Sequence, residues 1–344
     1  MNMKKTLNKN ILEVITIIIC LMILAICMGI GSVDIPVSDA LTIIRGKIFG
    51  SYIPDSLTST TSILWSIRLP RASTAFLVGG ALALSGTIMQ AVLQNPLASS
   101  YTLGVSSGAS LGAALIIVTE FTIPILGNIL LPVFGFIFGF GTVIIVLAIS
   151  AKFDSTMHSN TVILIGMVIS LFTNAVMTLV SSFARAHSQQ LLLWQMGSFS
   201  GKRWYHVQVL LPICIFGLIV ILYFGKSLDI MSFGDEQAYA MGVDVRRNKK
   251  ILLLLSALLT GASVCFSGTI GFVDLIAPHA VRIIFGSSHK RVAPISFFVG
   301  GAFMALCDLI ARTIVESELP VGAVTGIIGA PFFVWLYLRG RRNA

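Results

Sequence analysis

The tetrapeptide Ser85-Gly86-Thr87-Ile88 returns 182 residues later as Ser267-Gly268-Thr269-Ile270. The same shift also matches flanking residues that shape helices: Gly79 with Gly261, Pro96 with Pro278, and Gly104 with Gly286. These additional matches favour an internal repeat over a chance tetrapeptide. Because the two copies lie five apolar spans apart, they are expected to cross a membrane in opposite directions, a plan common among transporters.

Composition places the chain among membrane proteins. Of its 344 residues, 56% are apolar and 11% are charged, whereas soluble domains carry about 25% charged residues. Apolar windows near the ~20 residues needed to cross ~30 Å of hydrocarbon recur along the chain, so one helical bundle over residues 1–344 is predicted. The net charge of +9 could indicate a nucleic-acid partner. However, the basic residues collect between spans, which serves membrane orientation instead.

We therefore expect an all-α polytopic membrane protein with about ten transmembrane helices and an inverted internal repeat. The expected spans cover residues 11–31, 71–93, 102–119, 123–151, 161–183, 206–225, 250–269, 272–286, 294–315 and 321–338. The first span follows three lysines and could be a signal peptide. Because it exceeds the apolar core of about 7–15 residues in such peptides, an uncleaved span is favoured.

Basic clusters predict the orientation. Residues 246–250 and 339–342 are rich in Arg and Lys, and the positive-inside tendency then places both termini in the cytoplasm. The segment between the first two spans also carries basic residues although it falls outside, so the tendency holds only for the majority.

Several small residues and helix breakers allow two readings. Asn95-Pro96 and Pro278 are expected to interrupt helices, and Gly104, Ser106 and Ser107 open the third span. Small residues in a membrane allow close helix packing. Alternatively, the freed backbone groups line a wet path, since such groups survive at membrane depth only against protein or water. As a set they are path or helix-break candidates.

The segment from Gly234 to Val243, between the sixth and seventh spans, is predicted to be a short helix on the inner side. Asp235 and Glu236 suit a helix N-terminus, and Gly242 can cap its end. By composition alone it could be a mere connector.

The chain offers no candidate for catalysis, a cofactor or a metal. Residues 197–202 place three residues between two glycines where a phosphate loop needs four, and Arg203 stands where Ser or Thr binds magnesium. If transport uses ATP and magnesium, they belong to another polypeptide. His279 is interpreted as a packing histidine, and the five cysteines, all in apolar stretches, as reduced packing residues.

Two charged features remain open. Asp308 and Arg312 stand four residues apart on one helix, so their role is either a structural ion pair or a functional one. Arg68, Arg71 and Arg312 fall on the outer side, against the positive-inside tendency. They are expected to dock an extracytoplasmic protein by donating hydrogen bonds to its carboxylates. The alternative is that the arginines snorkel to lipid headgroups.

Two C-terminal signatures carry a family resemblance. The first is the run Gly271-Phe272-Val273-Asp274-Leu275-Ile276-Ala277-Pro278-His279-Ala280-Val281-Arg282. The second runs from Glu318-Leu319-Pro320-Val321-Gly322 to Gly329-Ala330-Pro331-Phe332-Phe333. Together with matches at 68–71, 95–98, 103–109, 194–198 and 234–243, they resemble the FecCD, or vitamin B12-type, permeases of bacterial ABC importers. Thr269 and Asp274 depart from the pattern, where many members have proline and glycine, and Asp274 is expected near the outer mouth.

The resemblance implies a type II ABC importer permease in the bacterial cytoplasmic membrane. Its implied partners are a second permease copy or close homologue, two cytoplasmic ABC ATPase subunits and an extracytoplasmic substrate-binding protein. It also implies that the inner short helix couples to the ATPase, through Gly234, Asp235, Glu236, Ala238, Ala240 and Gly242. The implied cargo is a ferric siderophore, with haem and cobalamin as alternatives.

Two other classes of protein are alternatives to an ABC importer permease. An ion-coupled secondary transporter needs buried acids within the spans, where only Asp308 qualifies, with Arg312 beside it. A membrane-embedded enzyme needs convergent catalytic groups, and the sequence shows none.

Overall fold

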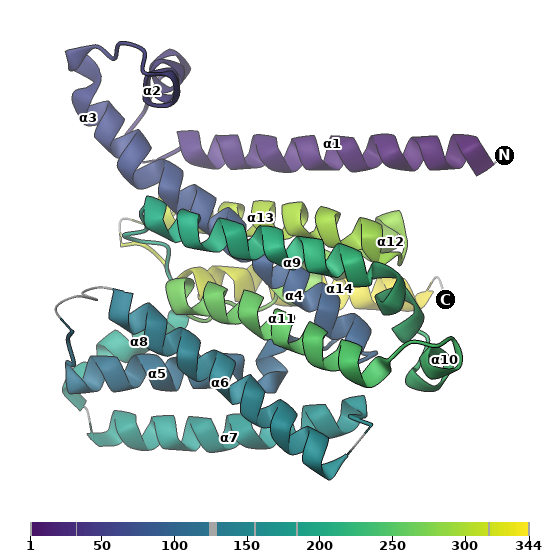
Figure 1. Ribbon diagram of the computed structural model, residues 1–344. Coiled ribbons are helices and arrows are strands. Elements are labelled where there is room, and N and C mark those ends of the chain that lie inside the picture. Colours follow the sequence, from purple (N-terminus) through teal and green to yellow (C-terminus); the bar gives the residue numbers. More distant parts are fainter. Residues whose placement is uncertain are drawn as a thin grey trace.

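The computed structural model describes residues 2–31, 33–123, 129–154, 156–183, 185–315 and 317–342. Within these ranges all regular structure is helical (Figure 1). Helices satisfy their backbone hydrogen bonds internally, as a lipid environment requires. Seven of these helices are long and apolar enough to cross a membrane, and two shorter apolar helices cover Val105–Thr119 and Val321–Trp335. The all-α polytopic fold is thus confirmed, while the number of about ten spans stays a prediction.

The first half of the chain forms α1 (Asn2–Gly29), α2 (Val37–Phe49), α3 (Thr58–Thr61), α4 (Leu69–Val92), α5 (Val105–Thr119), α6 (Leu130–Phe153) and α7 (Ser159–Phe183). The second half forms α8 (Ser188–Met196), α9 (Trp204–Met231), α10 (Asp235–Ala240), α11 (Val245–Ser267), α12 (Val273–Phe285), α13 (His289–Thr313) and α14 (Val321–Arg342). Each expected span overlaps one of these helices, and their assignment as membrane spans stays a prediction. Residues 124–128 of the expected span 123–151 lie outside the described residues.

The region between the first two expected spans is largely helical. After α2, a 3₁₀ turn (Asp55–Leu57), α3 and a π-helical segment (Ser62–Arg68) run directly into α4. The resulting helical stretch, Asp55–Val92, has 38 residues. At ~1.5 Å per residue it is longer than ~30 Å of hydrocarbon requires. It therefore projects beyond one end of the bundle, where Figure 1 shows α2 and α3.

The two ends of the bundle differ. The start of α1, the end of α14 and the short helix α10 lie together at one end (Figure 1). The sequence predicted that both termini and the 234–243 segment lie on the same side of the membrane, and this arrangement agrees with that prediction. We call this end the α10 end, and the opposite end the α2 end.

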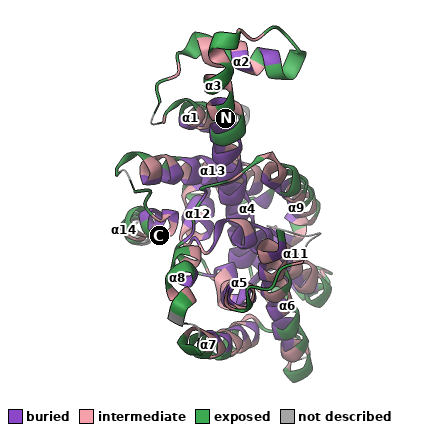
Figure 2. Cartoon of the chain, turned by 90° about the vertical axis from the view of Figure 1, so that its left-hand side faces the viewer, coloured by how far each residue is buried: buried purple, intermediate pink, exposed green. Residues whose placement is uncertain are grey.

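Helix α4 lies at the centre of the bundle. Its most apolar 18-residue window is entirely buried, and Figure 2 shows it surrounded by the other helices. Small residues make this packing possible. A Cβ atom on Gly79 would lie 2.2 Å from the carbonyl oxygen of Gly300 in α13, so the two backbones touch directly.

The order of helix lengths is similar in the two halves of the chain, although the predicted shift of 182 residues would pair α5 with residues 287–301, mostly in α13, and not with α12. Helices α4 to α7 have 24, 15, 24 and 25 residues, and α11 to α14 have 23, 13, 25 and 22. Each set thus places its shortest helix second. Helices α4 and α11 are antiparallel, because Ser85 hydrogen-bonds Thr260 near mid-helix while the start of α11 lies beside the end of α4.

Candidate functional site

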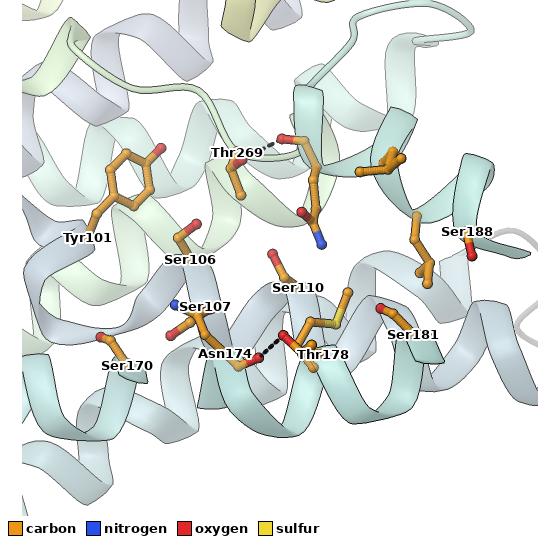
Figure 3. Close-up of a pocket in the computed structure, with 14 residues that line it drawn as sticks. Tyr101, Ser106, Ser107, Ser110, Ser170, Asn174, Thr178, Ser181, Ser188 and Thr269 are labelled. Carbon is orange, nitrogen blue, oxygen red and sulfur yellow. Dashed lines mark hydrogen bonds between the residues drawn. The ribbon is translucent and has the colours of Figure 1, made fainter. Parts of the chain in front are cut away.

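A polar cavity of about 560 Å³ lies between α5, α7 and α8 (Figure 3). Its lining side chains are hydroxyl, amide or apolar groups: Tyr101, Ser106, Ser107, Ser110, Ser170, Asn174, Met177, Thr178, Ser181, Ser188, Leu191, Leu192, Gln195 and Thr269. All of these groups are neutral at pH 7. We call this cavity the polar groove.

Helical spacing creates the groove. On α7, the polar residues Ser170, Asn174, Thr178 and Ser181 recur every three or four positions and therefore share one face. Figure 3 shows them below the serines of α5, with Thr269 on the opposite side. The hydroxyls of Ser170 and Thr178 donate to backbone carbonyls one turn earlier, at 2.8 and 2.9 Å. These bonds satisfy the donors and leave oxygen lone pairs facing the cavity.

The expected helix break at Asn95-Pro96 is present. Helix α4 ends at Val92, and the Asn95 side chain accepts a hydrogen bond from the backbone of Leu97 at 2.9 Å. A short 3₁₀ turn then leads to Gly104, whose φ of 83° favours glycine. Helix α5 starts directly afterwards, so the break delivers Ser106 and Ser107 to the polar groove. Their part in a transport path stays a prediction.

The expected break at Pro278 is wrong. Pro278 lies inside α12, and the interruption is upstream, between the end of α11 and Phe272, which has a φ of 71°. Proline cannot donate to the carbonyl four residues earlier, that of Asp274. The side-chain nitrogen of Gln90 lies 3.3 Å from this carbonyl oxygen and donates to it instead. The helix therefore continues through the proline.

Asp274 also differs from its expected place at the outer mouth. Its side chain is 1% exposed and accepts a hydrogen bond from the Ser99 hydroxyl. A Cβ on Gly86 of α4 would lie 1.8 Å from the Asp274 carbonyl oxygen. Asp274 is therefore part of the contact between α4 and α12.

The 234–243 segment forms the predicted short helix at the α10 end. Gly234 and Gly242, with φ of 129° and 79°, flank it. Phe233, Tyr239 and Met241 are exposed, as are the predicted Glu236, Ala240 and Gly242. Ala238 is fully buried against the bundle, so the expectation that it takes part directly in the contact with the ATPase is wrong.

Of the three arginines expected to be free for docking, Arg68 and Arg71 are buried, Arg312 is partly buried, and all three are already hydrogen-bonded. Arg68 is 4% exposed and donates to the backbone carbonyls of Gly29, at 2.7 Å, and Val33. Arg312 donates to the carbonyl of Cys27. These bonds fasten α1 to its neighbours. The guanidiniums therefore lack the accessible donors that the docking prediction required.

Arg71 forms the strongest ion pair of this group. Its Nη2 lies 2.9 Å from Asp308 Oδ1, and its Nη1 lies 2.6 Å from Glu318 Oε1. The expected partner of Asp308, Arg312, is farther away at 3.9 Å. The structural reading of Asp308 is thus favoured, with a different partner. Sequence spacing could not reveal it, because Arg71 and Asp308 stand 237 positions apart.

A second cavity, of about 610 Å³, lies between the start of α6, α8, α9 and the end of α11. Lys202 lies in the turn before α9, and burial there lowers its pKa to about 8.

The glycine-rich stretch that begins at Gly197 is hydrogen-bonded to two other segments. Ser198 donates to the Ser267 carbonyl at 2.9 Å, and Val321 donates to the Gly197 carbonyl at 3.1 Å.

A central helix held by ion pairs, broken helices and a polar groove beside apolar membrane-spanning helices define a multi-pass membrane transport protein. The model of the FecCD transport family matches residues 17–339. The chain belongs to this family of ABC transporter permeases.

Three relatives and one solved structure are similar over most of the chain. YvrB of Bacillus subtilis (strain 168), an ABC transporter permease protein, is 37% identical over 322 residues, 93% of this chain and 91% of that protein. The hemin transport system permease protein HmuU of Yersinia pestis is 38% identical, covering 83% and 87%. The cobalamin import system permease protein BtuC of Halobacterium salinarum is 37% identical, covering 81% and 74%. A solved metal-chelate type ABC transporter in an inward-facing conformation has a TM-score of 0.83 at 28% identity, covering 95% and 99%.

Proposed function

We propose that this chain is the permease subunit of a binding-protein-dependent ABC importer that moves a ferric siderophore or a similar large metal chelate into the cytoplasm. The polar groove carries the proposal. Its neutral hydroxyl and amide groups can exchange hydrogen bonds with a polar ligand without holding it by charge. A ligand that must pass needs such weak contacts, because tight binding would stop it.

The groove forms half of the proposed path, and a second permease copy or close homologue supplies the other half. Helix α7 lines the groove and also exposes large apolar residues, among them Leu171 and Phe172. An exposed apolar surface beside a polar cavity is typical of a protein–protein interface. A second permease would cover the apolar surface and complete the wall of the cavity. The two grooves would then face each other.

Two cytoplasmic ABC ATPases are proposed to dock at the α10 end. There the chain exposes an apolar group, Phe233, Tyr239 and Met241, around the short helix. The adjacent start of α11 carries Arg246 and Arg247, in agreement with a cytoplasmic side. In this reading ATP and magnesium belong to the ATPases, and both termini lie in the cytoplasm of a bacterial cell.

The extracytoplasmic binding protein is proposed to dock at the α2 end. Because Arg68, Arg71 and Arg312 already bond to groups of this chain, their proposed contribution is to hold the outer ends of α1, α4 and α13 in place for docking. Glu318, which pairs with Arg71, remains 41% exposed and links this buried group to the surface.

The relatives' names leave three chemical classes of cargo. HmuU is named for hemin and BtuC for cobalamin, and FecC of Escherichia coli (strain K12), 34% identical over 286 residues, for Fe(3+) dicitrate. All are large metal chelates, which suits a wide neutral groove. We favour the ferric siderophore and keep haem and cobalamin as alternatives.

An ion-coupled secondary transporter is the competing proposal. Its main candidate, Asp308, is held by two hydrogen-bonding nitrogens of Arg71 and is 1% exposed. A carboxylate fixed in this way is poorly placed to bind and release a coupling ion. The observation favours the ATP-driven importer.

The test is uptake into proteoliposomes that contain the permease with its ATPases and loaded binding protein. We expect uptake only with ATP, and a panel of ferric siderophores, haem and cobalamin identifies the cargo. Ser170→Trp should block the groove, whereas Ile219→Trp on the exposed side of α9 should not. ATP-independent uptake driven by an ion gradient would instead support the secondary transporter.

A further inference from the structure

A buried charge pair joins the short helix α10 to the bundle. Lys249, in the first turns of α11, is fully buried, and its Nζ lies 2.6 Å from Asp235 Oδ2 at the start of α10. A buried ammonium group needs all its donors satisfied. Lys249 also lies 3.2 Å from the Met157 carbonyl and 3.4 Å from the Ser159 hydroxyl, and donates to both.

The same pair reaches the end of α4. Gln94 lies just after this helix, and its side chain donates to the other oxygen of Asp235 at 2.8 Å. The Ser159 hydroxyl, at the start of α7, lies 3.4 Å from the Val92 carbonyl and donates to it. Four inner segments therefore meet at one charge pair: the end of α4, the turn between α6 and α7, the start of α10 and the start of α11.

Two of the residues that contact the charge pair have an unusual backbone conformation. Gln94 and Met157 have φ of 52° and 54°, which non-glycine residues seldom adopt. Such conformations persist where surrounding contacts fix them, often in switch regions. Here each of the two residues contacts one member of the charge pair, Gln94 through its side chain and Met157 through its carbonyl.

Both connected segments lead to the polar groove. The chain beyond Gln94 passes through the break to Ser106 and Ser107 of α5. Helix α7 starts at Ser159 and carries Ser170 and Asn174 three and four turns further on. A displacement of α10 that moves Asp235 must also move these segments or separate a buried charge from its partner, which is strongly unfavourable.

We propose that the pair of Asp235 and Lys249 transmits movement of α10 to both walls of the polar groove, from Asp235 through Gln94 to α5 and from Lys249 through Met157 and Ser159 to α7, with Lys249 as the positioning residue. This inference rests on the proposed function, because it assumes that an ATPase moves α10. It adds the physical connection between that contact and the transport path.

The experiment compares Lys249→Met with Lys250→Met, its partly exposed neighbour, in the complete complex with ATPases. A cysteine at Met241, 65% exposed beside α10, is cross-linked to the ATPase to report docking. ATP hydrolysis is measured with and without loaded binding protein. We expect Lys249→Met to keep the cross-link and basal hydrolysis but to lose stimulation by about 5- to 150-fold, the usual range of coupling between sites. Lys250→Met should retain the stimulation.

Stability is measured separately, because removing one member of a buried pair also destabilises the fold. The double variant Lys249→Met with Asp235→Asn removes both charges and should recover much of the lost thermal stability. It should not recover stimulation. If stimulation returns with stability, the pair is only structural and the inference is wrong.

The remaining outcomes separate this inference from the proposed function. Normal stimulation and uptake by Lys249→Met, with the cross-link present, overturn the inference and leave the importer intact. Failure of the Met241→Cys protein with Lys249 intact to cross-link places the ATPase elsewhere, and then the docking proposal and this inference fall together.

Discussion

Helices α4 and α7 are both long, apolar and predicted as membrane spans, yet they have different surroundings. The most apolar window of the helix that contains α4 is entirely buried, whereas 22% of the corresponding window of α7 is buried. Helix α4 carries glycines and alanines that admit neighbouring backbones, and Arg71, which pairs with Asp308 at the α2 end. Helix α7 has large apolar residues on one side and a polar stripe on another.

The difference shows that apolar content alone does not say what a span touches. Residue size and the placement of polar groups determine what a span contacts. Small residues permit contact between backbones, whereas large residues fill space against lipid or a partner. Helix α4 is thus the internal support of the chain. Helix α7 is the surface on which we propose the second permease and the cargo meet.

Removing the Arg71 charge at the α2 end of α4 should have the largest effect. Arg71→Gln leaves Asp308 buried without its main cation, and we expect a loss of about 3–5 kcal/mol in the free energy of unfolding. The measurement is thermal unfolding of the purified protein in detergent. Arg68→Gln is the control, because the hydrogen bonds of Arg68 to described residues go to backbone carbonyls, and its loss should cost about 1–3 kcal/mol. Equal effects of both variants would contradict the special role of the Arg71 and Asp308 pair.

A methyl group at the centre of α4 should have the next largest effect. In Gly86→Ala the new Cβ would lie 1.8 Å from the Asp274 carbonyl oxygen, so α4 and α12 must separate. Overpacking of this kind costs about 1–3 kcal/mol, measured by the same unfolding assay. Gly141→Ala in α6 is the matched control, because among the described residues a new Cβ there would meet nothing within 4 Å beyond its own helix backbone, and it should leave stability equal or higher. A neutral Gly86→Ala would mean that α4 is less tightly packed than the structure indicates.

Substitutions on the exposed side of α7 should barely affect the stability of the chain. Leu171→Cys changes a residue that is 70% exposed, and we expect a change within about 0.5 kcal/mol. In membranes, oxidation of this variant should produce a cross-linked pair of permeases if two copies meet at α7. A cysteine at Ile219 of α9, 60% exposed, should not cross-link. The reverse pattern would place the second copy on α9 and make α7 a lipid-facing helix.

The smallest effect is expected at the turn before α7. The Thr156 hydroxyl and the Thr156 and His158 amides donate to Asp154, and they hold the pKa of its carboxyl well below the usual range. The carboxyl has a lower pKa in the folded protein than in the unfolded chain, where it is about 3.9. The ionised carboxylate therefore stabilises the turn fully above the unfolded pKa. This stabilisation is lost as the pH falls through the folded pKa. Amide protection at Thr156 and His158 should therefore be constant from about pH 5 to 8. Asp154→Asn should reduce it without changing global unfolding, and a pH-dependent loss within that range would contradict this assignment.

Much of the fold followed from local patterns in the sequence. Apolar run lengths predicted the spans because a helix must cover the hydrocarbon thickness by itself. The break at Asn95-Pro96 and the short helix after Gly234 followed from residues whose backbone preferences act over a few positions. Ser106 and Ser107 were predicted for the path, but the polar stripe on α7 was overlooked although its spacing was present in the sequence.

The errors concern groups whose partners are distant in the chain. Pro278 was expected to break a helix, because the sequence does not show that Gln90 would serve the carbonyl of Asp274. The outer arginines were expected to be free, because their partners stand on other helices. In each case a polar group became compatible with burial only after tertiary contacts satisfied it.

The sequence by itself determined that this chain is a helical membrane protein and that its helices are interrupted at Asn95-Pro96 and around the short helix after Gly234, because these properties depend on hydropathy and on local backbone preference. Only the tertiary structure decided which span is central, which faces remain open and which charges pair. Arg71 finds Asp308 and Lys249 finds Asp235 through the packing of separate helices, and a buried charge is stable only where that packing brings its partner within hydrogen-bonding distance.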